Sequence, residues 1–399
     1  MNIRSITRFM YVLTTVALIS GFSACDNALN EFVSVLDDDE MPQLTGVSGE
    51  ILIGVVHPVT GRLSSQNPPM EYGFRLAVDE INNAQLGNAR LKLVIADGQS
   101  TAEGAVEAFK HLIDQDVPVI LGPASSSQAK AAFPIAQENQ VVVISPTSAA
   151  SGLSGIGDFV FRTSLVTDVL IPNGVSITQE KLGYQRVATI SDEIDVFSKD
   201  SDAVLKKALT ENGVEIVASE VFRTGETDFS AQLNRIKESN PDAVFISAPV
   251  VESPEIVIQG RALGIPTDVP FLIIVAFAQD GIETAGDAAE GVITFANWIS
   301  TASTPGNQAF VRNYQAAYGV APNTWAAQSY AAVYVLAKAI RDARLTGSMA
   351  THPTAIRDAM ANIMDFDTVL GKFAFDPVGD AIYEPKILIV KNGQFEVFK

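Results

Sequence analysis

Short apolar runs alternate with longer amphipathic segments from residue 50 onward. Residues 51–56 (ILIGVV) form a continuous apolar run, which is typical of a buried strand. In residues 71–84 the apolar side chains recur at the i, i+3, i+4, i+7 spacing of one helix face. The alternation continues with predicted strands at 91–96, 117–121 and 141–144 and predicted helices at 101–114 and 127–139. This order predicts parallel strands with helices on both faces of the sheet.

The pattern restarts after residue 164 and predicts a second α/β unit. Its expected strands are 186–190, 214–217, 243–246, 271–275 and 291–295, and its expected helices are 199–212, 229–239 and 254–263. A further long helix is predicted over residues 325–343. The sequence therefore indicates two lobes of one design, and ligands of such sheets bind beyond the carboxyl ends of the strands.

The N-terminus has the features of an export signal. Arg4 and Arg8 precede an apolar run at 11–22, whose length of about 12 residues is shorter than the roughly 20 that a membrane helix needs. Residues 21–25 (GFSAC) resemble a bacterial lipobox, with Phe at the position where Leu is usual. We therefore expect a lipoprotein signal peptide over 1–24 and lipidation of Cys25, which labelled palmitate would detect. The alternative is an ordinary signal peptide with an incidental cysteine. Residues 25–49 are expected to form a flexible acidic tether.

Composition narrows the classes of partner. The 399 residues include 46 acidic and 27 basic side chains, a formal charge of −19, which disfavours nucleic acid and anionic lipid as partners. One cysteine excludes an internal disulfide, and the three histidines are too scattered to indicate a metal site. No metal and no cofactor is expected.

Motifs of catalysis are absent from the sequence. It contains no G-x-S-x-G elbow, no G-x-G-x-x-G fingerprint, no P-loop and no H-E-x-x-H. We therefore expect a protein that is not an enzyme.

Hydroxyl side chains gather at two predicted strand ends. Residues 122–127 (GPASSS) follow one strand and open a helix, and residues 145–148 (SPTS) follow the next strand. Serines at a helix start commonly just cap it. They also offer hydroxyls and free N–H groups to an anion, with the help of the helix dipole. From these residues alone, capping and carboxylate binding are both open.

A series of fragments carries a family resemblance. In order they are 53–61 (IGVVHPVTG), 77–82 (AVDEIN), 121–126 (LGPASS), 225–233 (GETDFSAQL) and 240–244 (NPDAV). With them the chain resembles the type I periplasmic binding proteins of the branched-chain amino acid (Leu/Ile/Val) class, which are receptors of ABC importers. The resemblance implies an α/β fold of two Rossmann-like lobes with parallel sheets, joined by three crossovers and closing on a ligand.

The resemblance also implies where the lobes divide. It places the crossovers near Thr167, Asn297 and Asp376. Lobe 1 would comprise residues 50–167 and 298–375. Lobe 2 would comprise residues 168–297 and 376–399.

The same resemblance implies a set of ligand-binding residues. In the family a serine of the helix-opening loop and a strand-end Ser/Thr segment hold the ligand carboxylate. Those roles fall on Ser125, Ser126, Thr147 and Ser148. Phe197 would cover the ligand from lobe 2, and Gln66 would line the pocket for the ligand's side chain.

Two departures from the family pattern bear on the chemical class of the ligand. Members that bind α-amino acids place an acidic residue after the strand that matches 271–275, whereas residues 274–277 here are IVAF. The usual aromatic is also replaced in the loop at 248–250 (APV). A desolvated ammonium needs a partner, so either Glu252 or Asp280 substitutes, or the ligand is a carboxylate or amide without an ammonium.

Three functions follow from these observations. The first is a receptor, expected to be monomeric and anchored by lipid to a bacterial membrane, that captures a small solute for an ABC permease. The alternative is a sensory protein of the same fold that acts on a membrane kinase or chemoreceptor. An exported enzyme is the third and is disfavoured by the missing motifs.

Overall fold

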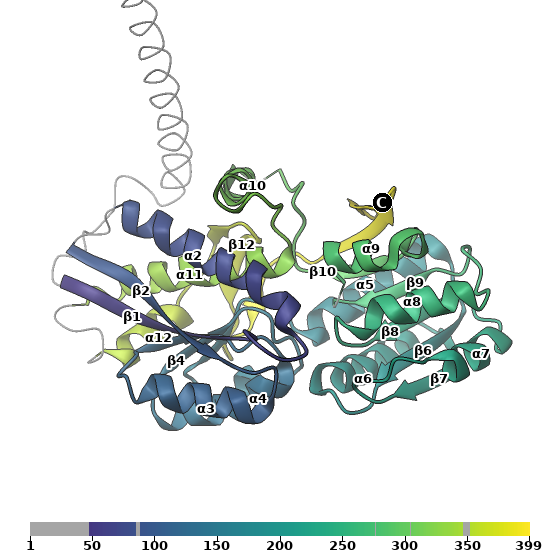
Figure 1. The fold of residues 1–399 in the computed structure, drawn as a ribbon, viewed down its shortest axis with the longest axis horizontal. Helices are drawn as coiled ribbons and strands as arrows, with labels where there is room; N and C mark the ends of the chain where they lie inside the picture. The colour runs from purple at the N-terminus through teal and green to yellow at the C-terminus, as the bar shows by residue number, and fades with distance from the viewer. Residues whose placement is uncertain (1–47, 85–87, 276, 304, 346–351) are drawn as a thin grey trace, which may run out of the picture.

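The computed structural model describes residues 48–84, 88–275, 277–303, 305–345 and 352–399. Two α/β lobes lie side by side (Figure 1). Lobe 1 is built on a five-stranded sheet and lobe 2 on a seven-stranded sheet. The predicted signal peptide, Cys25 and all but the end of the predicted tether lie outside the described residues.

All five strands of the large lobe 1 sheet are parallel. Their order is β2 (Asn88–Asp97), β1 (Ser48–His57), β3 (Val119–Leu121), β4 (Val142–Ser145) and β5 (Val160–Arg162). Successive side chains of β1 face opposite sides of the sheet. Val55 therefore packs in the core beneath α2 (Asn67–Asn83) and α11 (Thr324–Asp342). Val56 belongs to the core beneath α3 (Ala102–Ile113) and α4 (Ser126–Glu138).

The remaining elements of lobe 1 come partly from the last quarter of the chain. They are η1 (Ser64–Gln66), η2 (Ser154–Ile156), α10 (Pro305–Tyr318), α12 (Pro353–Ala361) and the small antiparallel sheet β11 (Phe366–Thr368), β12 (Gly371–Phe375) and β13 (Ala381–Ile382). The predicted helix 71–84 begins earlier, at Asn67, because Pro68 and Pro69 occupy the first turn, where a missing N–H costs nothing.

The lobe 2 sheet combines five parallel strands with an antiparallel hairpin. Its order is β15 (Gln394–Val397), β14 (Lys386–Lys391), β10 (Ile293–Ala296), β9 (Phe271–Ile274), β8 (Ala243–Ser247), β6 (Arg186–Asp192) and β7 (Glu215–Phe222). Its helices are α5 (Thr167–Leu182), α6 (Val196–Glu211), α7 (Ser230–Glu238), α8 (Glu252–Ala262), α9 (Gln279–Ala285) and η3 (Gly286–Ala289). The hairpin of β14 and β15 was not predicted. It adds an antiparallel edge to the predicted parallel sheet.

The chain passes between the lobes three times. The first passage runs from β5 to α5, next to the predicted Thr167, and the second leaves β10 at the predicted Asn297. The third lies between β13 and β14, later than the predicted Asp376. The backbone N–H of Asp376 bonds the Asp380 carbonyl oxygen at 2.8 Å, so the chain turns back into the small sheet instead of leaving lobe 1.

Four residues, which we call the hinge cluster, connect the three passages: Thr163, Leu165, Asn297 and Tyr383. The Leu165 backbone N–H donates to the side-chain oxygen of Asn297 at 3.1 Å. The Tyr383 hydroxyl lies 3.0 Å from that same oxygen and 3.0 Å from the Thr163 carbonyl oxygen. The passages are therefore joined through one buried amide.

Candidate ligand-binding site

A cavity of about 80 Å³, which we call the cleft pocket, lies between the two lobes. Lobe 1 contributes the segments that follow β1, β3 and β4, and lobe 2 contributes those that follow β6, β8 and β9. Parallel sheets present their ligand sites at these carboxyl ends. The lining residues are Arg62, Leu63, Gln66, Ala124, Ser125, Ser126, Thr147, Asp195, Phe197, Pro249, Val250, Val275 and Trp325.

Ser126 is a hydrogen-bond donor available to the cleft pocket. It is the first residue of α4 and is buried. Its hydroxyl oxygen accepts the backbone N–H groups of Ala149 and Ala150, at 3.2 and 3.1 Å. Because both contacts use the oxygen as acceptor, the hydroxyl proton is left for a ligand. The helix N-terminus adds a partial positive charge at the same place.

Ser125 and Thr147 also line the pocket, but both hydroxyls are engaged. Ser125 caps α4: its oxygen accepts the Gln128 backbone N–H at 3.3 Å, and the two residues form a capping box. The Thr147 hydroxyl donates to the Ala124 carbonyl oxygen at 2.6 Å. Of these neighbouring serines, Ser125 therefore caps the helix, and Ser126 retains its hydroxyl proton.

Three of the predicted residues lie outside the cleft pocket. Ser148 is fully buried behind its wall, where the Ser148 hydroxyl donates to the Ser145 hydroxyl at 2.7 Å. Glu252 is buried in lobe 2, and both of its carboxylate oxygens bind one nitrogen of Arg62. Asp280 lies in the first turn of α9, away from the lining, and burial raises the pKa of its carboxyl group.

Gln66 and Phe197, which the family resemblance implied as ligand-binding residues, line the pocket from opposite lobes. Gln66 comes from η1 in lobe 1 and Phe197 from the first turn of α6 in lobe 2. The predicted set therefore separates into five residues that share one cavity and three that do not.

Three lining residues with functional side chains were not predicted from the sequence: Arg62, Asp195 and Trp325. Asp195 accepts the Ser198 backbone N–H at 2.9 Å and so caps α6. An aspartate three residues before the N–H that donates to it is a detectable N-cap signal. Nothing in the sequence marks the pairing of Arg62 with Glu252, which are 190 residues apart.

Direct contacts between the lobes border the pocket. The Arg62 side-chain nitrogen Nη1 lies 2.7 and 2.8 Å from the two carboxylate oxygens of Glu252, whose Oε1 also accepts the Gly225 backbone N–H at 3.0 Å. The Ser127 hydroxyl donates to Asp195 at 2.9 Å and accepts the Val196 backbone N–H at 3.2 Å. The lobes are therefore closed against each other.

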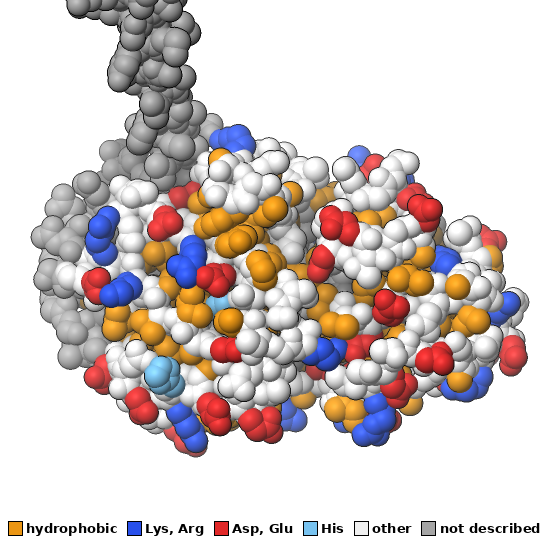
Figure 2. Space-filling model, in the orientation of Figure 1, with side chains coloured by type: hydrophobic (Ala, Val, Ile, Leu, Met, Phe, Trp, Pro, Cys, Tyr) orange, Lys and Arg blue, Asp and Glu red, His pale blue; other side chains and the backbone are white. Residues whose placement is uncertain are grey.

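The pocket wall carries both signs of charge. Arg62 engages Glu252 only through Nη1, so its other N–H groups are without partners among the described residues. Asp195 supplies a carboxylate on the opposite wall. On the face of the molecule in Figure 2, acidic and basic side chains are interspersed instead of being gathered into one basic patch.

The described residues offer neither a metal site nor a membrane-spanning helix. They contain no group of three or more His, Cys, Asp or Glu side chains placed to hold a metal ion. Every helix among them is too short or too polar to cross a bilayer.

Comparison with known proteins identifies the family. The model of a family described as periplasmic binding protein matches residues 50–385. A Leu/Ile/Val-binding protein of Rhizobium johnstonii is 25% identical over 339 residues, which cover 83% of this chain and 89% of the relative.

Two solved structures resemble the whole described body. A leucine-binding protein of Thermotoga maritima is 29% identical, with a TM-score of 0.81, covering 88% of this chain and 98% of that one. A branched-chain amino acid transporter substrate-binding protein of Streptococcus pneumoniae, solved with isoleucine, is 28% identical, with a TM-score of 0.79, covering 87% of this chain and 98% of that one. The two-lobed fold, the cleft and these matches agree, and the chain belongs to the periplasmic binding protein family.

Proposed function

We propose that the chain captures a small carboxylate solute in the cleft pocket and delivers it to the membrane subunits of an ABC importer. The observation that carries this proposal is the free hydroxyl proton of Ser126 at the N-terminus of α4, inside a cavity that both lobes close. A carboxylate is the group that such a donor set stabilises best.

The cleft pocket also contains a group suited to an ammonium. Glu252 is engaged by Arg62, and Asp280 lies outside the lining, which leaves Asp195 as the carboxylate on the pocket wall. Its oxygen Oδ1 accepts both the backbone N–H and the hydroxyl of Ser198. Its oxygen Oδ2 accepts from Ser127 and retains acceptor capacity for an ammonium. With the names of the relatives, this supports leucine, isoleucine and valine as the first ligands to test.

A thermal-shift screen tests the ligand class. The panel contains branched-chain amino acids, other amino acids, aliphatic and aromatic carboxylates, and amides. A ligand at about 100 times its Kd adds roughly 2.7 kcal/mol of stability, which is readily detected. Ser126→Ala should then weaken binding of any carboxylate by about tenfold to a hundredfold, because a hydrogen bond to a charged group is lost.

Matched variants sharpen the screen. Ser148→Ala removes a hydroxyl behind the pocket wall and should leave the affinity near that of the wild type. Asp195→Asn should weaken amino acids but not carboxylates that lack an ammonium. An affinity that Ser126→Ala leaves unchanged would contradict the proposed carboxylate site.

Lipid anchoring is the second part of the proposal. The family description names a periplasmic protein, and the GFSAC segment ending at Cys25 resembles a lipobox. Cys25→Ser should abolish labelling by palmitate and release the protein from the membrane fraction. Palmitate labelling that persists in this variant would show that Cys25 is not the anchor.

A further inference from the structure

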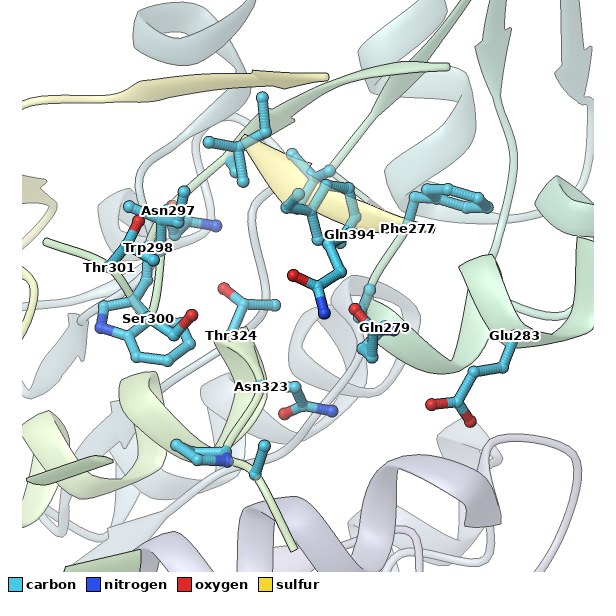
Figure 3. Close-up of a pocket in the computed structure, with 18 residues that line it drawn as sticks. Phe277, Gln279, Glu283, Asn297, Trp298, Ser300, Thr301, Asn323, Thr324 and Gln394 are labelled. Carbon is cyan, nitrogen blue, oxygen red and sulfur yellow. The ribbon is translucent and has the colours of Figure 1, made fainter. Parts of the chain in front are cut away.

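A second and larger cavity of about 410 Å³, which we call the hinge cavity, lies beside the passages between the lobes (Figure 3). Lobe 2 contributes α9 and the hairpin of β14 and β15, and the loop before α11 contributes the lobe 1 wall. Residues 297–301 of the second passage form the part of the lining that connects these two walls. Among the described residues, Val275 alone lines both this cavity and the cleft pocket.

A buried hydrogen-bond donor of Asn297 borders the hinge cavity and lacks an acceptor among the described residues. Asn297 is 1% exposed, and its side-chain oxygen already accepts from Leu165 and Tyr383 in the hinge cluster. Its amide nitrogen Nδ2 has no hydrogen-bond partner within the described part of the chain. In Figure 3 this nitrogen is turned towards the space between Thr324 and Gln394. A buried N–H left unpaired costs free energy, which an acceptor on a ligand would recover.

The other polar groups of the hinge cavity come from both lobes. The Thr324 hydroxyl is buried and, among the described residues, has no partner. Asn323 caps α11 through its side-chain oxygen, which leaves its amide nitrogen available. The Gln394 amide reaches into the cavity from β15 (Figure 3). These groups are uncharged donors and acceptors.

The charge of the lining excludes an anion. No lysine or arginine is among the residues that line the hinge cavity, and its one acidic residue, Glu283, is exposed. An anionic ligand would meet that carboxylate without a compensating cation, which electrostatics disfavours. A neutral ligand meets no such penalty.

The floor of the hinge cavity is apolar. Ala296, Ile299 and Leu388 form a small buried cluster, and Phe395 packs against it. The indole of Trp298 borders the same space and is held by a hydrogen bond of 2.6 Å to Asn307. A ligand with an apolar face and several hydroxyls would satisfy the floor and the polar walls together.

We propose that the hinge cavity is a second binding site, for a neutral hydroxyl-rich ligand of the size of a mono- or disaccharide. Its oxygens accept from the amides of Asn297 and Asn323 and exchange hydrogen bonds with Thr324 and Gln394. Its C–H face lies on the apolar floor. Because the walls belong to both lobes, an occupant favours the lobe arrangement in which both walls are present.

The chain has two tryptophans, so ligand binding at the two cavities can be followed separately by tryptophan fluorescence. Trp298 lines the hinge cavity and Trp325 lines the cleft pocket. In Trp325→Phe, Trp298 is the sole tryptophan, and its emission is titrated with D-glucose, sucrose and xylitol. The proposal expects a saturable change with at least one of these probes. The identity of the cleft ligand does not enter this measurement.

Matched variants in the Trp325→Phe background decide the assignment. Thr324→Val with Gln394→Leu removes two polar groups of the hinge cavity and should weaken the sugar by about tenfold or more. Gln394→Leu alone, at an exposed position, is the variant to use if the double variant does not fold. Ser126→Ala in the cleft pocket should leave sugar binding unchanged.

Three results would overturn the proposal. One is the lack of a saturable response to any of the three probes at millimolar concentration. Another is a response that Gln394→Leu and the double variant leave intact, which would place the sugar elsewhere. The third is a Trp298 response to carboxylates only, which would make the hinge cavity part of the cleft site.

Discussion

Each hydroxyl around the cleft pocket can donate one hydrogen bond, and the neighbouring groups determine which acceptor receives it. The Thr147 hydroxyl donates a hydrogen bond to the Ala124 carbonyl oxygen, and the Ser148 hydroxyl donates one to the Ser145 hydroxyl. The oxygen of Ser126 accepts two backbone N–H groups and leaves its proton unused. Residues of one chemical type, close in the sequence, thus differ in what they offer a ligand.

His57 allows a prediction about pH at the residue scale. It is fully buried at the end of β1, and burial lowers the pKa of its imidazole. Glu71, Asn67 and Asp97 raise this pKa and so offset part of the effect of burial, whereas Arg75 lowers it.

The unfolded chain therefore binds a proton at His57 at higher pH than the folded chain does. Folding stability should fall as the pH drops below the unfolded value of about 6.5. His57→Gln should lose less stability than the wild type between about pH 7 and about pH 5, in urea unfolding followed at each pH. The matched control is His111→Gln, at an exposed histidine. Equal pH slopes for wild type and His57→Gln would contradict the expectation.

At the scale of elements, lobe 1 depends on the contact of α2 with α11. Gly73 of α2 lies directly against the backbone of α11, and a Cβ there would be 2.4 Å from the Ala326 carbonyl oxygen. The Tyr334 hydroxyl of α11 also donates a hydrogen bond of 2.8 Å to the Glu80 carboxylate of α2. Close helix packing and a buried hydrogen bond together set the position of the loop that precedes α11.

Gly73→Ala should therefore destabilise the protein although alanine is the better helix former. Overpacking of this kind costs about 1–3 kcal/mol, which exceeds the helix-propensity gain of about 1 kcal/mol at most. The free energy of unfolding in urea measures the difference. Gly155→Ala is the matched control, because a Cβ there meets nothing within 4 Å. Equal losses for the two variants would argue against tight packing of α2 on α11.

At the scale of the whole molecule, the closed arrangement is held by contacts between the lobes themselves. Arg62 of lobe 1 meets the buried Glu252 of lobe 2, and Ser127 of α4 meets Asp195 at the start of α6. These contacts join the two lobes directly, protein atom to protein atom. They contribute to the free energy of closure in addition to the contacts that a bound solute makes.

Glu252→Gln should shift the ligand-free protein towards an open arrangement. The amide cannot supply the charge that pairs with Arg62, so the interlobe attraction weakens. Small-angle X-ray scattering should show a larger radius of gyration for this variant than for the wild type. Glu50→Gln makes the same charge change in an exposed pair with Lys92 inside lobe 1 and should leave the radius unchanged. Indistinguishable radii for Glu252→Gln and wild type would mean that other contacts hold the lobes closed.

Much of the architecture was predictable because it depends on local patterns. Apolar periodicity located β1 and the long helix α11, and the hydroxyl-rich strand ends located Ser126. Helix α5 was not predicted, since Pro172 and Gly174 interrupt its apolar period. The third passage was predicted too early, near Asp376. The chain turns back into the small sheet between Asp376 and Asp380, and the local sequence does not show that the chain reverses there.

The sequence by itself determined the fold class, the two-lobed design and five of the residues that line the cleft pocket. The fold class and the two lobes follow from side-chain periodicity, and the hydroxyl residues follow from strand ends that must meet at one edge of a parallel sheet. Gln66 and Phe197 were named from the family resemblance. Only the tertiary structure decided that Glu252 pairs with Arg62, that Asp195 lines the pocket, and that Asn297 faces a second cavity. Each of these depends on residues far apart in the chain, whose distance is set by lobe packing and has no local signature.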